Sequence, residues 1–224
     1  MTSSRTGAII VAAGKSERMG DVDKLLAPVA GRPLVAWSIE AFAAVEEIDE
    51  VVVVASRTNR EAIEALVTST GRMRVVEGGA RRRDSVRAGI DALGDCEYIV
   101  VHDGARPLVT HELIEAALAG ARETGAALCA VPVADTVKRG DLEGLVRTTV
   151  SRQGLWLAQT PQAFGRDLLL RAHASTDVDA TDDAALIEWL GEPVRLVMGS
   201  MRNIKVTAPE DLALAEALFR LKPS

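Results

Sequence analysis

Short, almost continuous apolar runs alternate along the first half of this chain with segments whose apolar residues recur every three or four positions. The runs are rich in Val, Ile and Ala, which is typical of strands buried on both faces, and they occupy residues 8–12, 51–55, 73–76, 98–102 and 126–132. The helical spacing predicts helices over residues 33–45, 59–68, 84–93 and 112–123. This alternation predicts a Rossmann-like α/β fold, a mostly parallel sheet flanked by helices and joined by right-handed crossovers.

The alternation breaks at about residue 133, where charged and Thr/Val-rich runs surround Gly140 and Gly144 without a helical period. Residues 133–155 are therefore expected to form a projecting β-hairpin arm. Further helices are expected at residues 167–174, 182–190 and 209–221, and extended segments at 194–198 and 203–206. Because no linker or repeat interrupts the chain, residues 1–224 are expected to form a single domain that carries this arm.

Composition limits the partners of the chain. Lys and Arg number 26 against 32 Asp and Glu, and this formal charge of −6 argues against binding to nucleic acid polymers. The two cysteines, Cys96 and Cys129, lie in separate apolar segments and are expected to be free thiols. Since no apolar run approaches the roughly 20 residues that cross a bilayer, a cytoplasmic protein without membrane contact is expected.

The first candidate site follows the first predicted strand, where IIVAA runs into AGKSERMGDVDK. Gly14 permits a tight turn whose backbone N–H groups can hold phosphate oxygens, while Lys15, Arg18 and Lys24 supply cations. The carboxyl end of a first parallel strand is a common ligand position. The segment matches neither GxGxxG nor GxxxxGK[ST], which disfavours both NAD and P-loop chemistry.

A second candidate site is GGARRRDSV, residues 78–86. Gly78 and Gly79 allow the backbone to approach a flat ligand closely. Asp84 and Ser85 are candidates to cap the next helix, and Ser85 is also free to hydrogen-bond a base. The three arginines between them, residues 81–83, are interpreted as solvated side chains without individual ligands.

A third candidate site is VHDGARPLV, in which a carboxylate ends a buried strand. Asp103 is suited to hold Mg²⁺ on phosphates or to accept from a substrate hydroxyl, and Arg106 is suited to grip an anion. A structural Asp–Arg pair is the alternative. His102 is expected to pack or hydrogen-bond rather than to titrate in catalysis.

These three segments, together with ADTVK, LAQTPQAF, TDDAALIE and NIKVTAPEDLALAEAL, resemble the 2-C-methyl-D-erythritol 4-phosphate cytidylyltransferases of the non-mevalonate isoprenoid pathway. The resemblance runs from about residue 8 to residue 218. It implies a fold of the nucleotide-diphospho-sugar transferase type. It also implies transfer of CMP from CTP to the phosphate of methylerythritol phosphate, with release of pyrophosphate and a requirement for Mg²⁺.

The resemblance also assigns roles to individual residues. Cytidine and the triphosphate would be lined by backbone groups of Ala12, Ala13 and Gly14. The base would be contacted by Gly79 and Ser85. The transition state is stabilised by Arg18 and Lys24, and the substrate phosphate is positioned by Arg152 and Lys205. Substrate is further bound by Asp103, Arg106, Thr136, Thr160 and Thr181, with Asp103 also the candidate metal ligand.

Four of these residues have simpler local interpretations. Polar, strand-like stretches contain Arg152 and Lys205, and there a solvated charge is the ordinary interpretation. Thr160 before Pro161 is typical of a turn, and Thr181 before two aspartates is typical of a helix N-cap. In the resembling family the arm clasps a second subunit, so a homodimer is implied in which Thr136 and Arg152 complete the active site of the neighbouring chain.

Other functions remain open. Ribitol 5-phosphate cytidylyltransferases share most of these motifs, and a pyrophosphorylase that uses UTP or GTP is a more distant possibility. A non-catalytic nucleotide-binding module is the alternative from another class. The chain also departs from the family pattern, with DKLL at residues 23–26 where a Pro-Lys-Gln run is common and Met201-Arg202 before NIKVT where an acidic residue is common.

Overall fold

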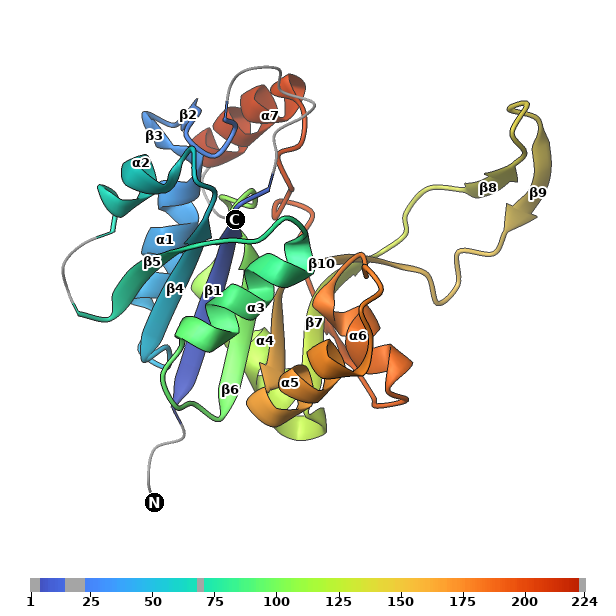
Figure 1. Ribbon diagram of the computed structural model, residues 1–224. Coiled ribbons are helices and arrows are strands. Elements are labelled where there is room, and N and C mark those ends of the chain that lie inside the picture. Colours follow the sequence, from blue (N-terminus) through green and yellow to red (C-terminus); the bar gives the residue numbers. More distant parts are fainter. Residues whose placement is uncertain (1–4, 15–22, 68–70, 222–224) are drawn as a thin grey trace.

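The computed structural model describes residues 5–14, 23–67 and 71–221, and these form a three-layered α/β body with a long hairpin standing out from it (Figure 1). The strands of the central sheet are β1 (Thr6–Ala12), β4 (Glu50–Ala55), β5 (Met73–Glu77), β6 (Tyr98–Asp103), β7 (Ala126–Pro132), β10 (Trp156–Gly165) and β11 (Arg195–Met198). The helices are α1 (Leu34–Ala44), α2 (Arg60–Glu64), α3 (Arg82–Ala92), α4 (His111–Thr124), α5 (Arg166–Ser175), α6 (Asp183–Trp189) and α7 (Pro209–Arg220). A short ribbon of β2 (Pro28–Val29) and β3 (Arg32–Pro33) precedes α1.

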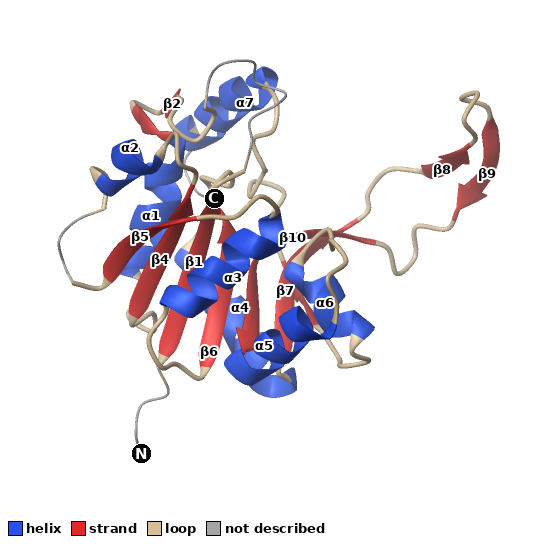
Figure 2. Cartoon of the chain, viewed as in Figure 1, coloured by secondary structure: helices blue, strands red, loops and turns tan. Residues whose placement is uncertain are grey.

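The central sheet has the strand order β11-β7-β10-β6-β1-β4-β5 within the described residues. Strand β1 pairs in parallel with both β4 and β6, and β4–β5 and β7–β11 are parallel as well. Only β10 runs the other way among these strands, antiparallel to β6 and β7. The predicted mostly parallel sheet flanked by helices is confirmed (Figure 2).

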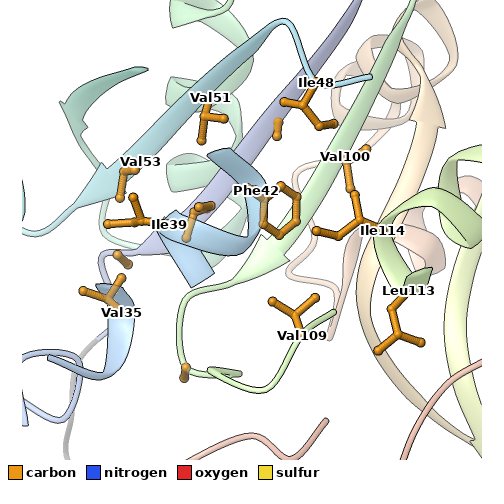
Figure 3. Packing of buried hydrophobic residues seen from close by; sticks show 14 of the residues in the cluster. Val35, Ile39, Phe42, Ile48, Val51, Val53, Val100, Val109, Leu113 and Ile114 are labelled. Atoms are coloured by element: carbon orange, nitrogen blue, oxygen red, sulfur yellow. The ribbon is translucent and has the colours of Figure 1, made fainter. Parts of the chain in front are cut away.

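The core lies on both faces of this sheet, which explains the continuous apolar runs. Along β4, Val51 and Val53 face one cluster with helices α1 and α4, whereas Val52 and Val54 face a second cluster with α3, α5 and α6. Figure 3 shows the first cluster, in which the fully buried Phe42 packs between the sheet and α4. A strand covered on both faces has no polar side to alternate with its apolar one.

Strand β10 was not predicted as a strand, and the expected turn at Thr160–Pro161 is wrong. Both residues lie inside β10, at a shift in the pairing register with β7 between Ala158 and Gln162. The irregular pairing accommodates a proline, which has no N–H to donate to a neighbouring strand. The chain therefore brings Thr160 to the middle of the sheet, directly beside β6.

Several helix boundaries also differ from the predicted ones. Helix α3 begins at Arg82, before the predicted start at Asp84, whose carboxylate instead reaches back from the first turn to the N–H of Arg81 (3.2 Å). Helix α2 covers only Arg60–Glu64 of the predicted residues 59–68, the last of which lies outside the described residues. Residues 203–206 join no sheet.

The predicted arm is present, since β8 (Val137–Gly140) and β9 (Val146–Val150) form an isolated antiparallel pair. It stands away from the body in Figure 1. Its tip exposes Leu142, Leu145 and Val146, with Leu142 fully accessible. Over the described residues, no helix has the length and apolar character needed to cross a membrane.

Candidate active site

The predicted ligand-binding segments meet at the carboxyl ends of β1, β5 and β6, because parallel strands end at the same edge of the sheet. A cavity of about 630 Å³ opens there. Of the predicted site residues, those that line it are Ala13, Gly14, Lys24, Gly79, Ser85, Asp103 and Lys205. The volume is of the size that small-molecule ligands occupy.

Gly78 allows the loop after β5 to approach the end of β1. A Cβ atom at Gly78 would lie 2.5 Å from the Cβ of Ala13 and 2.7 Å from the Oγ of Ser85. At Gly79 an added Cβ would lie 2.3 Å from the Cβ of Asp84. The two glycines are therefore required by close packing of the loop on α3 and β1, which leaves backbone along one wall of the cavity.

Asn59 connects the end of β1 to the segment that carries Lys24. Its buried amide donates to the carbonyl of Ala12 (3.0 Å) and to the Asp23 carboxylate (2.7 Å). Ala12 itself is buried, so its contribution to the site is through its backbone. Asn59 was missed from sequence because an isolated Asn in a loop is first interpreted as turn or cap chemistry.

A second, smaller cavity of about 190 Å³ adjoins the first. It shares Arg82, Asp103 and Lys205 with the larger cavity. Its remaining walls are Arg106, Ala158, Gln159, Thr160, Gln162, Thr181 and Asp182. Two ligands, one in each cavity, would thus meet at one carboxylate and two cations.

Asp103 is the centre of this junction. The Nζ of Lys205 lies 2.8 Å from Oδ2, and the Nε atoms of Arg82 and Arg106 lie 3.7 Å and 3.8 Å from the carboxylate. Burial alone would favour the neutral acid, but the charges of Lys205, Arg82 and Arg106 outweigh it and hold the pKa of Asp103 well below its usual range. The junction is therefore a permanently charged site.

Arg82 is a site residue that the sequence interpretation missed. Its Nη1 donates to Asp183 Oδ2 at 2.7 Å, and the other carboxylate oxygen of Asp183, a residue 1% exposed, lies 3.1 Å from His173 Nε2. Burial disfavours the charge of Arg82, yet Asp183 and Asp103 raise its pKa above the ordinary value. The link joins α3 to α6 across the small cavity.

Buried hydrogen bonds hold Arg106 and Thr160 around His102. Thr160 Oγ1 accepts from the N–H of Asp103 (3.0 Å) and lies 3.0 Å from His102 Nδ1. His102 Nε2 lies 3.2 Å from the carbonyl of Arg106, whose guanidinium donates to the carbonyl of Asn203 (2.8 Å). A neutral imidazole that accepts from Thr160 and donates to Arg106 satisfies every one of these contacts.

Burial lowers the pKa of His102 to about 4, and this predicts a specific dependence of stability on pH. Between about pH 6.5 and pH 4 the unfolded histidine binds a proton that the folded one does not, so stability falls on acidification, by about 3 kcal/mol from this residue. Urea unfolding should therefore show a smaller loss between pH 7 and pH 4 for His102→Gln than for the wild type. An equal loss of stability between pH 7 and pH 4 in the two proteins would contradict a neutral, buried imidazole at His102.

Thr181 is not the N-cap that its position suggested. Asp182 caps α6, accepting from the N–H of Ala185 at 3.0 Å. The second carboxylate oxygen of Asp182 accepts from Gln162 at 2.7 Å. Thr181, one residue earlier, is exposed and lines the small cavity.

Two of the described site residues predicted from sequence lie away from this junction within one chain. Arg18 lies outside the described residues. Thr136 and Arg152 are exposed at the base of the arm, where the Arg152 guanidinium donates to the carbonyl of Ala134. Neither lines the two cavities.

Among the described residues, the donors present suit a divalent cation that bridges ligand and protein. The described residues contain no group of three or more His, Cys, Asp or Glu side chains that could enclose a metal ion. Asp103 supplies one carboxylate to both cavities. Mg²⁺ is commonly held by one or two carboxylates together with substrate phosphates and water, and the donor set here suits that mode.

Comparison with known proteins places the chain among enzymes of one kind. Residues 6–221 match the family model of 2-C-methyl-D-erythritol 4-phosphate cytidylyltransferase. A protein of that name from Dehalococcoides mccartyi (strain CBDB1) is 42% identical over 221 residues, covering 97% of both chains. A bifunctional enzyme from Desulforudis audaxviator is 47% identical over 96% of this chain and 56% of its own length.

Solved structures agree with these relatives. The 4-diphosphocytidyl-2C-methyl-D-erythritol synthase of Anaerococcus prevotii superposes with a TM-score of 0.87 at 30% identity, covering 98% of this chain and all of the other. The 2-C-methyl-D-erythritol 4-phosphate cytidylyltransferase of Thermus thermophilus gives a TM-score of 0.80 at 34% identity, over 95% and 98% of the two chains.

Proposed function

The chain belongs to the 2-C-methyl-D-erythritol 4-phosphate cytidylyltransferase family, and we propose that it transfers CMP from CTP to the phosphate of 2-C-methyl-D-erythritol 4-phosphate. The products are 4-diphosphocytidyl-2-C-methyl-D-erythritol and pyrophosphate. The observation that carries this proposal is the pair of adjoining cavities that share Arg82, Asp103 and Lys205. The larger suits a nucleoside triphosphate and the smaller, more polar one suits a polyol phosphate.

In this reaction an oxygen of the acceptor phosphate attacks the α-phosphorus of CTP. The new P–O bond forms as the bond between the α-phosphorus and its bridging oxygen breaks, and pyrophosphate leaves with the electron pair. Because the attacking phosphate is already ionised, positioning and cations matter more than a general base. His102 is neutral, buried and engaged at both nitrogens, which supports a structural role for it.

The proposed role of each residue is supported by the cavity that it lines. CTP would be bound by the backbone at Ala12, Ala13, Gly14 and Gly79 and by Ser85. The acceptor would be bound by Arg106, Thr160 and Thr181, all of which line the small cavity, and by Asp103 at the junction. Lys24 and Lys205 would supply charge at the transferred phosphate, together with Arg18, which lies outside the described residues.

Mg²⁺ is proposed as the cofactor, held by the CTP phosphates with Asp103 as its protein ligand. When bound, it would offset charge on the phosphate oxygens. The remaining contribution of Asp103 is to fix the ammonium of Lys205, at 2.8 Å, beside the reacting groups.

A cytoplasmic location is proposed because CTP is an intracellular nucleotide.

A homodimer through the arm is the second part of the proposal. Val137–Gly140 and Val146–Val150 make no sheet contact with the body, and Leu142, Leu145 and Val146 expose apolar surface that a partner would cover. In such a dimer Thr136 and Arg152 reach the neighbouring active site, which accounts for their distance from the junction in one chain.

Mixed dimers test this shared site. Lys24→Ala and Arg152→Ala proteins should each have low activity, but unfolding and refolding them together should restore about a quarter of wild-type activity. Half of random dimers are mixed, and one of their two sites keeps both residues. The control is a mixture of Lys24→Ala with Lys205→Ala, whose two residues line the same cavity of one chain and which should restore nothing. Equal activity of both mixtures would contradict arm exchange.

An assay of pyrophosphate release tests the substrates. CTP with methylerythritol phosphate should give release, whereas UTP, GTP or ATP should give little. The family match favours methylerythritol phosphate over ribitol 5-phosphate and disfavours a non-catalytic module. Release with ribitol 5-phosphate but not with methylerythritol phosphate would overturn the proposed acceptor.

A further inference from the structure

Two arginines leave buried donor atoms without partners at the small cavity. Nη2 of Arg82 and Nε of Arg106 have no hydrogen-bond partner, although both atoms are shielded from solvent. Both residues line the cavity of about 190 Å³. An unpaired buried N–H of a guanidinium destabilises the folded chain, so such atoms are expected to find an acceptor in a bound ligand.

The guanidinium of Arg82 is held in place before any ligand arrives. Nη1 is bonded to Asp183 Oδ2 at 2.7 Å, and Asp183 is fixed on its other side by His173 at 3.1 Å. His173 and Asp183 are 2% and 1% exposed at their side chains. Because the guanidinium is planar, this anchorage also fixes the direction of Nη2.

The charges around the cavity balance one another without a ligand. Arg82, Arg106 and Lys205 carry positive charge, and Asp103, Asp182 and Asp183 carry negative charge. The carboxylates of Asp103 and Asp183 have lowered pKa values because neighbouring positive charges and hydrogen bonds outweigh the cost of burying them. The two unpaired N–H donors, rather than a net charge, therefore point to an acceptor atom on a ligand.

We propose that Arg82 is a substrate-binding residue whose Nη2 donates to an oxygen of the acceptor phosphate, and that Asp183 is the positioning residue that aims it. The inference rests on the proposed function and adds to it a residue on α3. The acceptor is favoured over CTP as the ligand because Arg106, the other arginine with an unpaired buried donor, lines the small cavity and not the larger one.

Steady-state kinetics with each substrate varied in turn test this. Arg82→Gln should raise KM for methylerythritol phosphate about 10- to 100-fold, as expected for the loss of one charge-assisted hydrogen bond. KM for CTP should change less than about threefold. Asp183→Asn should also raise KM for methylerythritol phosphate more than KM for CTP, but by a smaller factor than Arg82→Gln. The matched control is Arg87→Gln on the same helix, where Arg87 forms an exposed pair with Asp91 and should be silent.

The double variant keeps the test decisive if Arg82→Gln folds poorly. Arg82→Gln leaves Asp183 buried without its arginine, whereas the double variant with Asp183→Asn removes both charges. Because Asp183 acts through Arg82, the double variant should bind the acceptor no worse than Arg82→Gln, although it unfolds at a higher temperature. If the rise in KM for the acceptor in the double variant equalled the product of the rises in the two single variants, the positioning role of Asp183 would be contradicted.

The outcomes separate this inference from the proposed function. Equal rises in KM for CTP and for the acceptor would place Arg82 on the nucleotide or in a purely structural role, and would overturn the inference. Losses of activity that only track the fall in melting temperature of each variant would also overturn the inference. If the wild type itself fails to transfer CMP in this assay, the proposed function is contradicted.

Discussion

Lys205→Met should lower kcat by about 10²- to 10³-fold while changing KM for CTP less than about threefold, a size typical of losing one group that stabilises transition-state charge. Lys205 lies at the junction of the two cavities with its Nζ 2.8 Å from Asp103. Methionine keeps most of the length of the side chain and removes the charge. Stopped-flow or steady-state assays with CTP and methylerythritol phosphate measure the effect.

Arg171→Met is the control for this variant. Arg171 is a cation of α5 that donates to Glu192 Oε1 in an exposed pair at 2.9 Å. Its replacement should leave kcat within about twofold, since exposed pairs of this kind contribute little. If Lys205→Met raised KM for both substrates with kcat intact, Lys205 would contribute to binding alone, and its role at the transferred phosphate would be wrong.

Asp103→Asn should have two large effects, one on catalysis and one on folding. The carboxylate offsets Arg82, Arg106 and Lys205, and its loss leaves these cations facing one another in a mostly buried site. Breaking a buried ion pair from one side costs about 3 kcal/mol or more of folding stability. kcat should fall by at least about 10²-fold, because Lys205 also loses its fixed position.

The stability effect of Asp103→Asn has a defined pH dependence. Because the pKa of Asp103 is lowered in the folded state, its contribution to stability is present above its unfolded pKa of about 4 and is lost as the pH falls below it. Urea unfolding should therefore show the largest difference from wild type at neutral pH and a smaller one in acid. Asp91→Asn, on the exposed side of α3, is the control and should cost less than about 1 kcal/mol. A similar cost for both variants would contradict the charge cluster.

The main sheet could be predicted from sequence because burial on both faces leaves an unambiguous local pattern. Residues 51–55 are five consecutive apolar residues, and the structure buries each of them. Strand β10 could not be predicted in this way, because Gln159, Thr160 and Pro161 interrupt it. Its register shift is stabilised by neighbours from β6 and β7 that no local pattern contains.

The residues of the candidate site likewise include some that could be predicted from the local sequence and some that could not. Gly78 and Asp103 could be singled out from sequence because Gly78 lies two residues after the predicted strand 73–76, and Asp103 directly follows the predicted strand 98–102. Arg82 could not be, since three consecutive arginines give no indication of which one turns inward, and its partner Asp183 is 101 positions away. A signal for Asp183 did exist. It stands three and four residues before the buried Leu186 and Ile187, which places it on the buried face of α6.

The most direct test of the account is ³¹P NMR of CTP, methylerythritol phosphate and Mg²⁺ incubated with the wild-type protein and with Lys205→Met. The wild type should convert the acceptor monophosphate signal into the two coupled signals of a diphosphate diester, with one pyrophosphate per product, and Lys205→Met should do so at least about 10²-fold more slowly. An unchanged acceptor signal, or CMP and pyrophosphate formed without the diester, would contradict the proposed transfer.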